Sequence, residues 1–304
     1  MDYKAIIETV YNNIKGIKDL GEIATYIPEL AKVDPNKFGV HLCTIDGFEY
    51  GVGDCFDKFS IQSIAKVLSL CLAYHIKGES IWNRLGVEPS GNSFNSLAQL
   101  EYENGIPRNP FINAGAMVIC DILISELEHP KKDFLSFLQN LFANPQLAYS
   151  QRIVDSEKSI GYRNVALCNF IKSFDNIKND PEEVLDFYFN LCSIEANCQE
   201  LSKAFLYLAN GGVHPSNGAV IISPSKTKRV NAVMQTCGFY DESGEFSFKV
   251  GLPGKSGVGG GITAIHPNQC TITVWSPRLN KKGNSFKGVR FLEEFTTQTA
   301  LSIF

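Results

Sequence analysis

Strand-like segments stand at both ends of this 304-residue sequence, and a long helical stretch lies between them. Near the N-terminus, "FGVHLCTIDGFEYGVGD" is typical of two strands joined by an Asp46-Gly47 hairpin turn. After Asn210-Gly211-Gly212, the runs "FSFKV", "GITAIH" and "CTITVWS" are short and β-rich, and "EEFTTQTALSIF" is expected to close the chain as a helix. A single sheet built from these segments would bring the two chain ends together.

This order of elements predicts an α/β (α+β) fold with two lobes. Residues 2–18 show helical spacing, and the signals from about 70 to 210 are mostly helical. We expect residues 1–70 and 210–304 to form an antiparallel sheet flanked by helices, and residues about 71–209 to form a helical lobe. Clefts tend to lie between lobes, so side chains near the lobe junctions are the first candidates for a functional site.

Charge and hydropathy exclude several classes of partner. The formal net charge is -4 and the pI is about 5.8, so we expect neither nucleic acid nor an anionic membrane as the main partner, since both require a basic face. The basic runs "KTKR" and "NKKGNSFKGVR" are interpreted as solvated surface. The start "MDYKAIIETV" lacks the basic-then-apolar order of a signal peptide, and the longest apolar run, "AGAMVICDILI", is short and contains Asp121, so no membrane span is expected.

The nine cysteines are spread singly from Cys43 to Cys270 without a C-x-x-C pair. This pattern fits neither a disulfide scaffold nor a zinc site, and it favours a reducing, cytoplasmic location. The five histidines contain no H-E-x-x-H motif or other pair at ligand spacing. We therefore expect no metal site.

The stretch "FSIQSIAKVLSLCLAYH" is apolar almost all the way round from Ile64 to Tyr74, which is typical of a helix buried on every side. Lys66 is the exception, and it lies on the same helix face as Ser63, one turn earlier. A buried ammonium is costly unless it is paired or has lost its proton. A deprotonated Lys66 could act as a general base toward Ser63, at a helix start whose N–H groups stabilise an oxyanion. The alternative is that Lys66 pairs with an acid and Ser63 caps the helix, and this motif alone leaves both open.

The S-x-x-K pattern is weak by itself, because it also occurs as Ser223/Lys226 and Ser225/Lys228. Both of these copies lie in "SPSKTKR", a polar run with a proline that is typical of a loop. We interpret them as accidental. Only the Ser63 copy places its lysine in a buried helix.

A second stretch, "GLPGKSGVGGGITAI", has two interpretations. As a phosphate-binding loop it would need glycine at 249, which is lysine here, and a helix directly after Ser256, whereas Pro253 removes one N–H donor and glycines follow. The second interpretation is a K-S/T-G element on an edge strand, as found beside S-x-x-K in penicillin-recognising enzymes, with Lys255 as a second cation. The glycines then allow the backbone to come close to a substrate.

The sequence resembles one family, the serine-dependent glutaminases, whose fold is like that of the serine β-lactamases. The matching blocks are "TYIPELAKVDP", "FSIQSIAKVLSL", "EPSGNSFNS", "RNPFINAGAM", "SEKSIGYRN", "DFYFNLCS", "LANGGVHP", "GFYDESGEF" and "PGKSGVGGGI". They run in family order from about Tyr26 to the C-terminal helix. The resemblance implies a single catalytic domain over residues 1–304.

The resemblance also implies a role for each matched residue. Ser63 would be the nucleophile, Lys66 its base, Tyr188 an aid to proton transfer and Lys255 the nearby cation, and the oxyanion hole would be formed by the N–H groups of Ser63 and Val258. Substrate contacts fall on Tyr26, Gln62, Asn113, Glu157, Asn164 and Tyr240, beside Ser63, Tyr188 and Val258. As the one anion among them, Glu157 is assigned to the α-ammonium of glutamine. The asparagine amides and tyrosine hydroxyls can hold its carboxylate and carboxamide.

Without the resemblance, each of these residues has a simpler interpretation. Asn113 would cap a helix, Glu157 would be a solvated acid in a first helical turn, Tyr188 would belong to an aromatic core stripe, Tyr240 would end a strand and Tyr26 would pack on a loop. The sequence also departs from some relatives, which carry tyrosines near Asn169 and Phe170 and a polar residue at Leu191. These departures put hydroxyl contacts near 169–170 in doubt.

The sequence thus predicts hydrolysis of L-glutamine to glutamate and ammonia through a Ser63 glutamyl ester, without metal or cofactor. A homodimer or homotetramer is expected. One alternative is a penicillin-recognising serine acyl-transferase or β-lactamase that uses Ser63, Lys66 and Lys255. Another is a non-catalytic protein that binds an amino acid.

Overall fold

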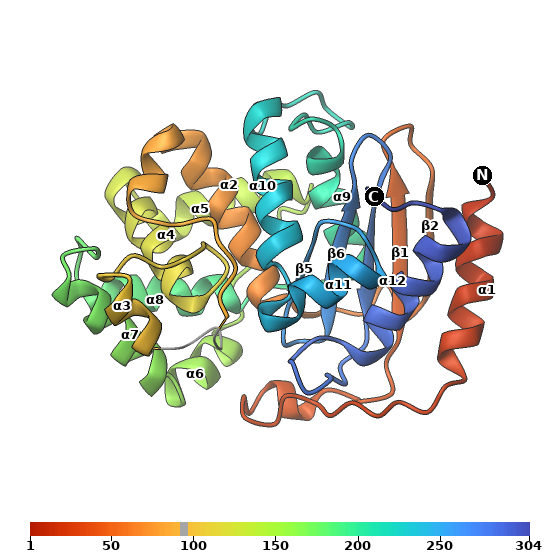
Figure 1. The fold of residues 1–304 in the computed structure, drawn as a ribbon, viewed down its shortest axis with the longest axis horizontal. Coiled ribbons are helices and arrows are strands. Elements are labelled where there is room, and N and C mark those ends of the chain that lie inside the picture. The colour runs from red at the N-terminus through yellow and green to blue at the C-terminus, as the bar shows by residue number, and fades with distance from the viewer. Residues whose placement is uncertain (92–96) are drawn as a thin grey trace.

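The computed structural model describes residues 1–91 and 97–304, and its centre is a five-stranded antiparallel sheet of order β2-β1-β7-β6-β5. The strands are β1 (Gly39–Thr44), β2 (Glu49–Gly53), β5 (Gly254–Ser256), β6 (Gly261–His266) and β7 (Cys270–Trp275). β1 pairs with β7 along its whole length, from Gly39 opposite Trp275 to Thr44 opposite Cys270. The predicted sheet, formed from both ends of the chain, is confirmed (Figure 1).

Helices cover both faces of the sheet. Side chains such as Val40 and Ile272 form one apolar cluster with α1 (Tyr3–Lys15) and α12 (Phe286–Thr299). α9 (Cys198–Ala209) packs against β1, β6 and β7. A 2.6 Å hydrogen bond joins the hydroxyl of its Ser202 to His41 Nδ1 on β1. α9 lies within the range that the sequence placed with the helical lobe, yet it packs on the sheet. Most of the apolar side chains of α9 are buried, and a helix buried on more than one face needs an apolar surface on each side. The sheet provides one of these surfaces, and the neighbouring helices provide the other.

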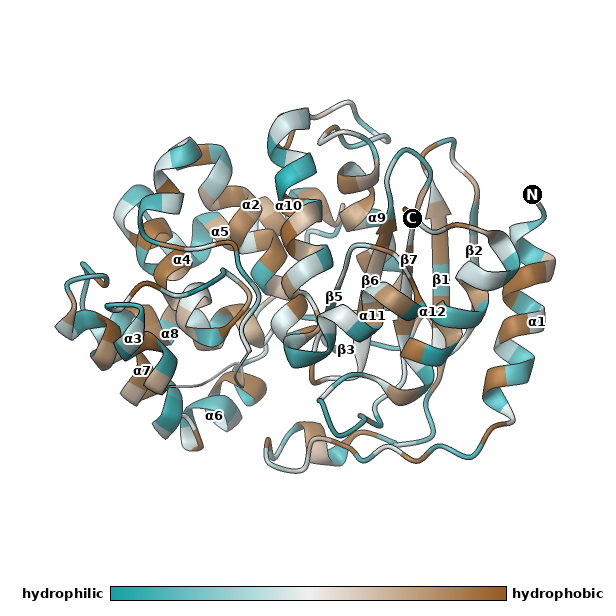
Figure 2. Cartoon of the chain, viewed as in Figure 1, coloured by the Kyte–Doolittle hydropathy of each residue, from teal (hydrophilic) through white to brown (hydrophobic). Residues whose placement is uncertain are grey.

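The remaining helices before residue 198 form a cluster beside the sheet (Figure 1). They are α2 (Ala65–Lys77), α3 (Leu97–Tyr102), α4 (Asn113–Glu126), α5 (Pro130–Leu141), α6 (Gln151–Ser159), α7 (Tyr162–Ser173) and α8 (Pro181–Cys192). α2 packs against α4 and α8 and is buried from Ala65 to Cys71, as its sequence predicts (Figure 2). A short ribbon, β3 (Phe59–Ser60) with β4 (Glu195–Ala196), precedes α2 and ties it to the end of α8.

Two predictions after residue 210 are wrong. "SPSKTKR" is not a loop but the start of α10 (Pro224–Cys237), where Ser223 is the N-cap that accepts from Lys226 N and Pro224 occupies the first turn. Lys226 Nζ donates to the carbonyl of Tyr74 at the end of α2, which gives this S-x-x-K copy a structural role. "FSFKV" is not a strand but the end of α11 (Ser243–Lys249). Phe246 is buried whereas Phe248 is 90% exposed, although strand alternation would place both on one face.

Short 3-10 helices lie between these elements: η1 (Leu30–Lys32), η2 (Gln62–Ile64), η3 (Gly78–Asn83) and η4 (Tyr240–Glu242). The predicted C-terminal helix ends at Thr299, because Ala300 has left-handed backbone angles, and the last four residues are not helical. The loop predicted over "GVEPSGNSFNS" extends into residues 92–96 and so lies partly outside the described residues.

All nine cysteines are free and buried. In the described part of the chain, no helix is long and apolar enough to cross a bilayer. Residues 1–91 and 97–304 also hold no cluster of three or more side chains of the kinds that bind metal ions.

Candidate active site

A cavity of about 230 Å³ collects residues from both parts of the molecule. It is lined by Tyr26, Ile27, Gln62, Ser63, Asn113, Glu157, Ile160, Arg163, Asn164, Tyr188, Cys192, Tyr240 and Val258. Every residue that the sequence analysis named as a substrate contact is therefore in one place. Lys66 and Lys255 are not in the lining and lie fully buried behind it.

Ser63 lies in η2, directly before α2, at the point where the chain leaves the short β3 strand. The preceding Gln62 has φ +49°, a left-handed conformation that a side chain adopts at a cost and that is often found at functional sites. Ser63 is 9% exposed and does not cap α2, whose N-cap is Ile64 without a side-chain hydrogen bond. The alternative in which Ser63 serves as a helix cap is wrong.

The glycine-rich turn after Lys255 packs directly on the backbone before Ser63. A Cβ atom at Gly257 would lie 2.6 Å from the carbonyl oxygen of Ile61, and one at Gly259 would lie 2.2 Å from that of Ser60. Trp275 Nε1 donates to the Gly259 carbonyl at 3.1 Å and fixes the turn from the other side. Only glycine permits this approach, which places Val258 in the same cavity as Ser63.

The K-S-G element forms an edge strand. Lys255 and Ser256 lie on β5, at the edge of the sheet, and a turn to β6 follows instead of a helix. The edge-strand prediction is confirmed, and the phosphate-loop alternative is wrong. Within the described residues the N–H of Val258, in the turn itself, donates no backbone hydrogen bond.

Lys66 is buried without an acidic partner among the described residues. Its Nζ donates to Asn113 Oδ1 at 2.7 Å and to the Phe111 carbonyl at 3.3 Å, and it lies 5.8 Å from the centre of the Tyr188 ring. Desolvation lowers the pKa of Lys66 to about 8. The alternative of an acid-paired lysine is wrong, and a substantial fraction of the amine is neutral near pH 8.

Lys255 contacts backbone carbonyls instead of the cavity. Its Nζ donates to Ser256 O at 2.6 Å and to Gly238 O at 3.1 Å, and it lies 4.7 Å from the centre of the Tyr240 ring. Burial, and next the charge of Lys66, lower the pKa of Lys255 well below its usual value. Each of two buried amines disfavours a positive charge on the other. Lys255 therefore favours the neutral form of Lys66 only while Lys255 itself is protonated.

Two tyrosines of the lining, Tyr240 and Tyr188, have hydroxyl groups that interact with other residues of the site. Tyr240, in η4 with φ +56°, donates to the Ser256 carbonyl at 3.4 Å, and its hydroxyl also interacts with that of Ser63. Tyr188, on α8, interacts with the thiol of Cys192 one turn later. Burial raises the pKa of both tyrosines, and that of Tyr188 well above its usual value, so both hydroxyls remain protonated at neutral pH.

Glu157 supplies a buried carboxyl group to the cavity. It lies near the end of α6, not in its first turn, and is 7% exposed, so its interpretation as a solvated first-turn acid is wrong. Its Oε1 has no hydrogen-bond partner among the described residues. Burial raises its pKa, against the lowering effects of Gln62 and Lys66.

Asn113 and Asn164 are linked, since Asn113 Nδ2 donates to Asn164 Oδ1 at 3.0 Å. Asn113 is the first residue of α4, but its side chain binds Lys66 and not the helix end, so the helix-cap alternative is wrong. Tyr26, 56% exposed, lies at the outer part of the lining. Asn169 and Phe170 do not line the cavity.

Four lining residues were not predicted from the sequence: Ile27, Ile160, Arg163 and Cys192. Arg163 directly precedes Asn164 in "SEKSIGYRN", and Cys192 lies one helical turn after Tyr188. Both residues lie in blocks that carry the family resemblance, Arg163 in "SEKSIGYRN" and Cys192 in "DFYFNLCS". Helical spacing from Tyr188 would have placed Cys192 on the same face.

Comparisons with known proteins point to one family. The model of the family described as Glutaminase matches residues 21–304. A glutaminase of Saccharophagus degradans is 56% identical over 304 residues, covering 100% of this chain and 99% of the relative, and one of Christiangramia forsetii is 54% identical with both chains covered in full.

Solved structures give the same result. One described as "Probable glutaminase ybaS" superposes with a TM-score of 0.94 at 32% identity, covering 100% of this chain and 99% of the other. The structure "Mglu in its tris and glutamate form" gives 0.93 at 29% identity, covering 100% and 68%. The fold is the serine β-lactamase-like fold of bacterial glutaminases.

Proposed function

The chain belongs to the glutaminase family and hydrolyses the side-chain amide of glutamine to glutamate and ammonia, and we propose that Ser63 is its nucleophile. One observation carries this proposal: Ser63 lines the cavity, and three residues later, in the first turn of α2, Lys66 is buried without an acidic partner and has a pKa lowered to about 8. The names of the relatives favour this function over a penicillin-recognising acyl-transferase and over a non-catalytic amino-acid-binding protein.

The first half of the reaction forms an ester. The neutral amine of Lys66 accepts the proton of Ser63, whose Oγ attacks the side-chain carbonyl carbon of glutamine. The carbonyl oxygen becomes an oxyanion, which the N–H groups of Ser63 and Val258 stabilise. The C–N bond then breaks, and ammonia leaves with the proton returned by Lys66, directly or through the protonated hydroxyl of Tyr188.

The second half releases glutamate. Water attacks the ester carbon while Lys66 accepts one of its protons, and a second oxyanion forms at the same N–H groups. The bond from this carbon to Ser63 Oγ breaks, and the serine recovers its proton from Lys66. The raised pKa of Tyr188 supports Lys66 as the base, because a phenol that stays protonated can donate a proton but cannot readily accept one.

The buried carboxyl of Glu157 is proposed to bind the α-ammonium of glutamine. Its Oε1 is buried and unpartnered in the described structure, and an ammonium would supply both the hydrogen bond and the opposite charge. Asn113, Asn164 and the hydroxyls of Tyr26 and Tyr240 then remain for the carboxylate and the carboxamide. A site with this many polar groups should reject analogues that lack one of them.

The test is ammonia release from L-glutamine by the wild type, Ser63→Ala and a matched control, Ser69→Ala. Ser69 is a buried serine on α2, and its hydroxyl donates only to the Lys66 carbonyl. We expect Ser63→Ala to lose activity by about 10⁴-fold or more and to keep glutamine binding, while the control retains activity. Full activity of Ser63→Ala would exclude this nucleophile, and glutamine binding by the wild type without turnover would favour the binding-protein alternative.

We propose that residues 1–304 act as one catalytic domain, because the cavity draws its lining from both lobes. We propose a homodimer or homotetramer in a reducing cytoplasm, a compartment that suits nine free thiols. Light scattering of the purified protein would test the assembly.

A further inference from the structure

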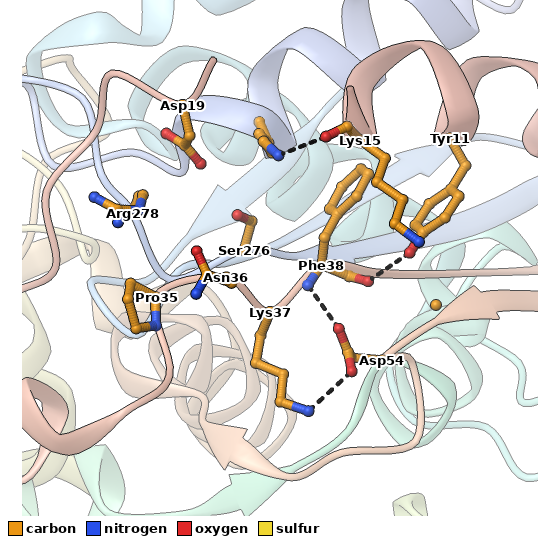
Figure 3. Close-up of a pocket in the computed structure, with 12 residues that line it drawn as sticks. Tyr11, Lys15, Asp19, Pro35, Asn36, Lys37, Phe38, Asp54, Ser276 and Arg278 are labelled. Carbon is orange, nitrogen blue, oxygen red and sulfur yellow. Dashed lines mark hydrogen bonds and ion pairs between the residues drawn. The ribbon is translucent and has the colours of Figure 1, made fainter. Parts of the chain in front are cut away.

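A second cavity, of about 410 Å³, lies away from the active site and shares no residue with it (Figure 3). It is formed where the end of α1, the segment before β1, the chain after β7 and the start of α12 meet. Its lining is Tyr11, Lys15, Asp19, Pro35, Asn36, Lys37, Phe38, Gly53, Asp54, Ser276, Arg278 and Lys287. The aromatic pair Tyr11 and Phe38, stacked at 4.7 Å, gives it an apolar wall.

The cavity carries an excess of positive charge that its own acids do not neutralise. Lys37 is paired with Asp54 at 2.9 Å and with Asp57 at 2.7 Å. Lys15, Arg278 and Lys287 have no carboxylate partner among residues 1–91 and 97–304.

Backbone contacts hold two of these cations in place. Lys287 Nζ donates to the Lys15 carbonyl at 3.1 Å, and Arg278 Nη1 donates to the Gly21 carbonyl at 3.2 Å. Each bond uses one donor and leaves other N–H donors of the same group for a ligand. The remaining acid, Asp19, has its Oδ1 bound to the N–H of Gly21 at 3.0 Å.

Ser276 provides an independent sign of a ligand. It is 1% exposed, and its Oγ has no hydrogen-bond partner in the part of the chain that the structure describes. Its backbone is fixed, since its N–H donates to Gly260 O at 3.0 Å and its carbonyl accepts from Ser285 Oγ at 2.7 Å. Figure 3 shows its hydroxyl pointing into the space between Asp19 and Phe38. A buried hydroxyl without a partner is rare in native proteins unless something else binds it.

We propose that this cavity binds a small oxyanion, a carboxylate or a phosphate. Arg278 and Lys287 supply the charge and Ser276 supplies a buried donor, which together match the several acceptor oxygens of such a group. The apolar wall accommodates a short carbon chain if the ligand is an organic acid. This site does not depend on the proposed chemistry of Ser63.

The experiment is calorimetric titration of the full-length protein with inorganic phosphate and, separately, with glutarate, at low ionic strength in an oxyanion-free buffer. The variants are Lys287→Gln and Ser276→Ala. The control is Lys281→Gln, which removes the same charge at an exposed position outside the lining. Glu157→Gln serves as a second control, because it changes the active site, to which glutarate could also bind.

We expect one equivalent of probe to bind, with the Kd raised about tenfold by Lys287→Gln and about three- to tenfold by Ser276→Ala, while both controls stay within about twofold. Binding of phosphate alone identifies an inorganic or phosphorylated ligand. Binding of glutarate alone identifies an organic acid if Lys287→Gln weakens it and Glu157→Gln does not, whereas glutarate binding that only Glu157→Gln weakens belongs to the active site and contradicts the proposal. Unchanged kcat/KM and thermal unfolding would show that Lys287→Gln and Ser276→Ala are folded. The proposal fails if neither probe binds at millimolar concentration, or if Lys281→Gln weakens binding as much as Lys287→Gln.

Discussion

Lys66 Nζ donates to Asn113 Oδ1 at 2.7 Å, across the contact between α2 and α4, and this neutral amide stands where an acid would be expected beside a buried lysine. An amide satisfies one donor without stabilising the positive charge as a carboxylate would. The relationship therefore keeps the pKa of Lys66 low, at about 8, because desolvation is not opposed by an ion pair. Asn113 also donates to Asn164, so the same side chain connects Lys66 to another residue of the cavity lining.

The pH dependence of the reaction should report this lysine. If Lys66 acts as a neutral base, kcat/KM rises with pH and levels off above about 8. Asn113→Asp adds a carboxylate next to Nζ, which stabilises the ammonium and should move the rising limb up by about one pH unit or more. Asn164→Asp, one side chain further away, should move it less. If kcat/KM rose at the same pH in the wild type and in Asn113→Asp, a group other than Lys66 would be the base.

Removing the lysine should make the protein more stable while abolishing its activity. The pKa of Lys66 falls from 10.5 to about 8 on folding, so below pH 8 both states are protonated and the folded state bears the full cost of the buried charge, about 3 kcal/mol. Between about pH 8 and 10.5 the unfolded chain binds more protons than the folded one, so stability rises with pH in this window.

Lys66→Met should remove that cost and its pH dependence. The carbonyl of Phe111 and the amide of Asn113 would each lose a donor, which reduces the net gain at pH 7 to about 1–2 kcal/mol. We expect a Tm higher by about 2–5 °C in calorimetry. Lys77→Met, on the same helix but partly exposed and paired with Glu126, should keep activity and gain no stability. Loss of stability in Lys66→Met would show that the lysine is structural.

The sequence predicted the architecture well because the relevant signals are local. The alternation around Asp46-Gly47 and the apolar run from Ile64 to Tyr74 depend on near neighbours in the chain, and β1, β2 and α2 form where expected. "FSFKV" failed because its alternation is too short to separate a strand from a helix, and the buried contact of Phe246 with Phe239 decides for the helix.

The candidate site was found through motifs, and its electrostatics were not. Nothing near Lys66 in the sequence shows that its partner is an amide 47 residues away instead of a carboxylate. The depth at which Glu157 is buried depends on how α6 packs, since its local sequence resembles any surface helix. Long-range packing sets both pKa values, so the sequence could suggest these residues but could not assign their charge.

Glu157 should determine recognition of the α-ammonium of the substrate. Glu157→Gln keeps the shape of the side chain but removes its charge, so KM for glutamine should rise by about 10–100-fold with a smaller effect on kcat. The wild type should also prefer glutamine strongly over its analogue without the ammonium, glutaramate, and the variant should lose most of that preference.

Steady-state kinetics on both substrates would measure this coupling. Glu183→Gln, an exposed acid in the first turn of α8, should behave as the wild type. If Glu157→Gln weakened the reaction of both substrates equally, the residue would not contact the ammonium.

The glycine turn should be required for the oxyanion hole, and Gly259 tests this most directly. A Cβ atom there would lie 2.2 Å from the Ser60 carbonyl oxygen, and neither backbone can move without shifting Val258 or the segment that leads into Ser63. Gly259→Ala should therefore lower kcat by about 10²–10³-fold, the usual effect of losing one oxyanion donor, with little change in KM. Gly244→Ala is the control, because a Cβ atom at that position in α11 meets nothing within 4 Å. Circular dichroism and thermal unfolding would establish that both variants fold, and a folded Gly259→Ala with an unchanged kcat would exclude the proposed oxyanion role of the Val258 N–H.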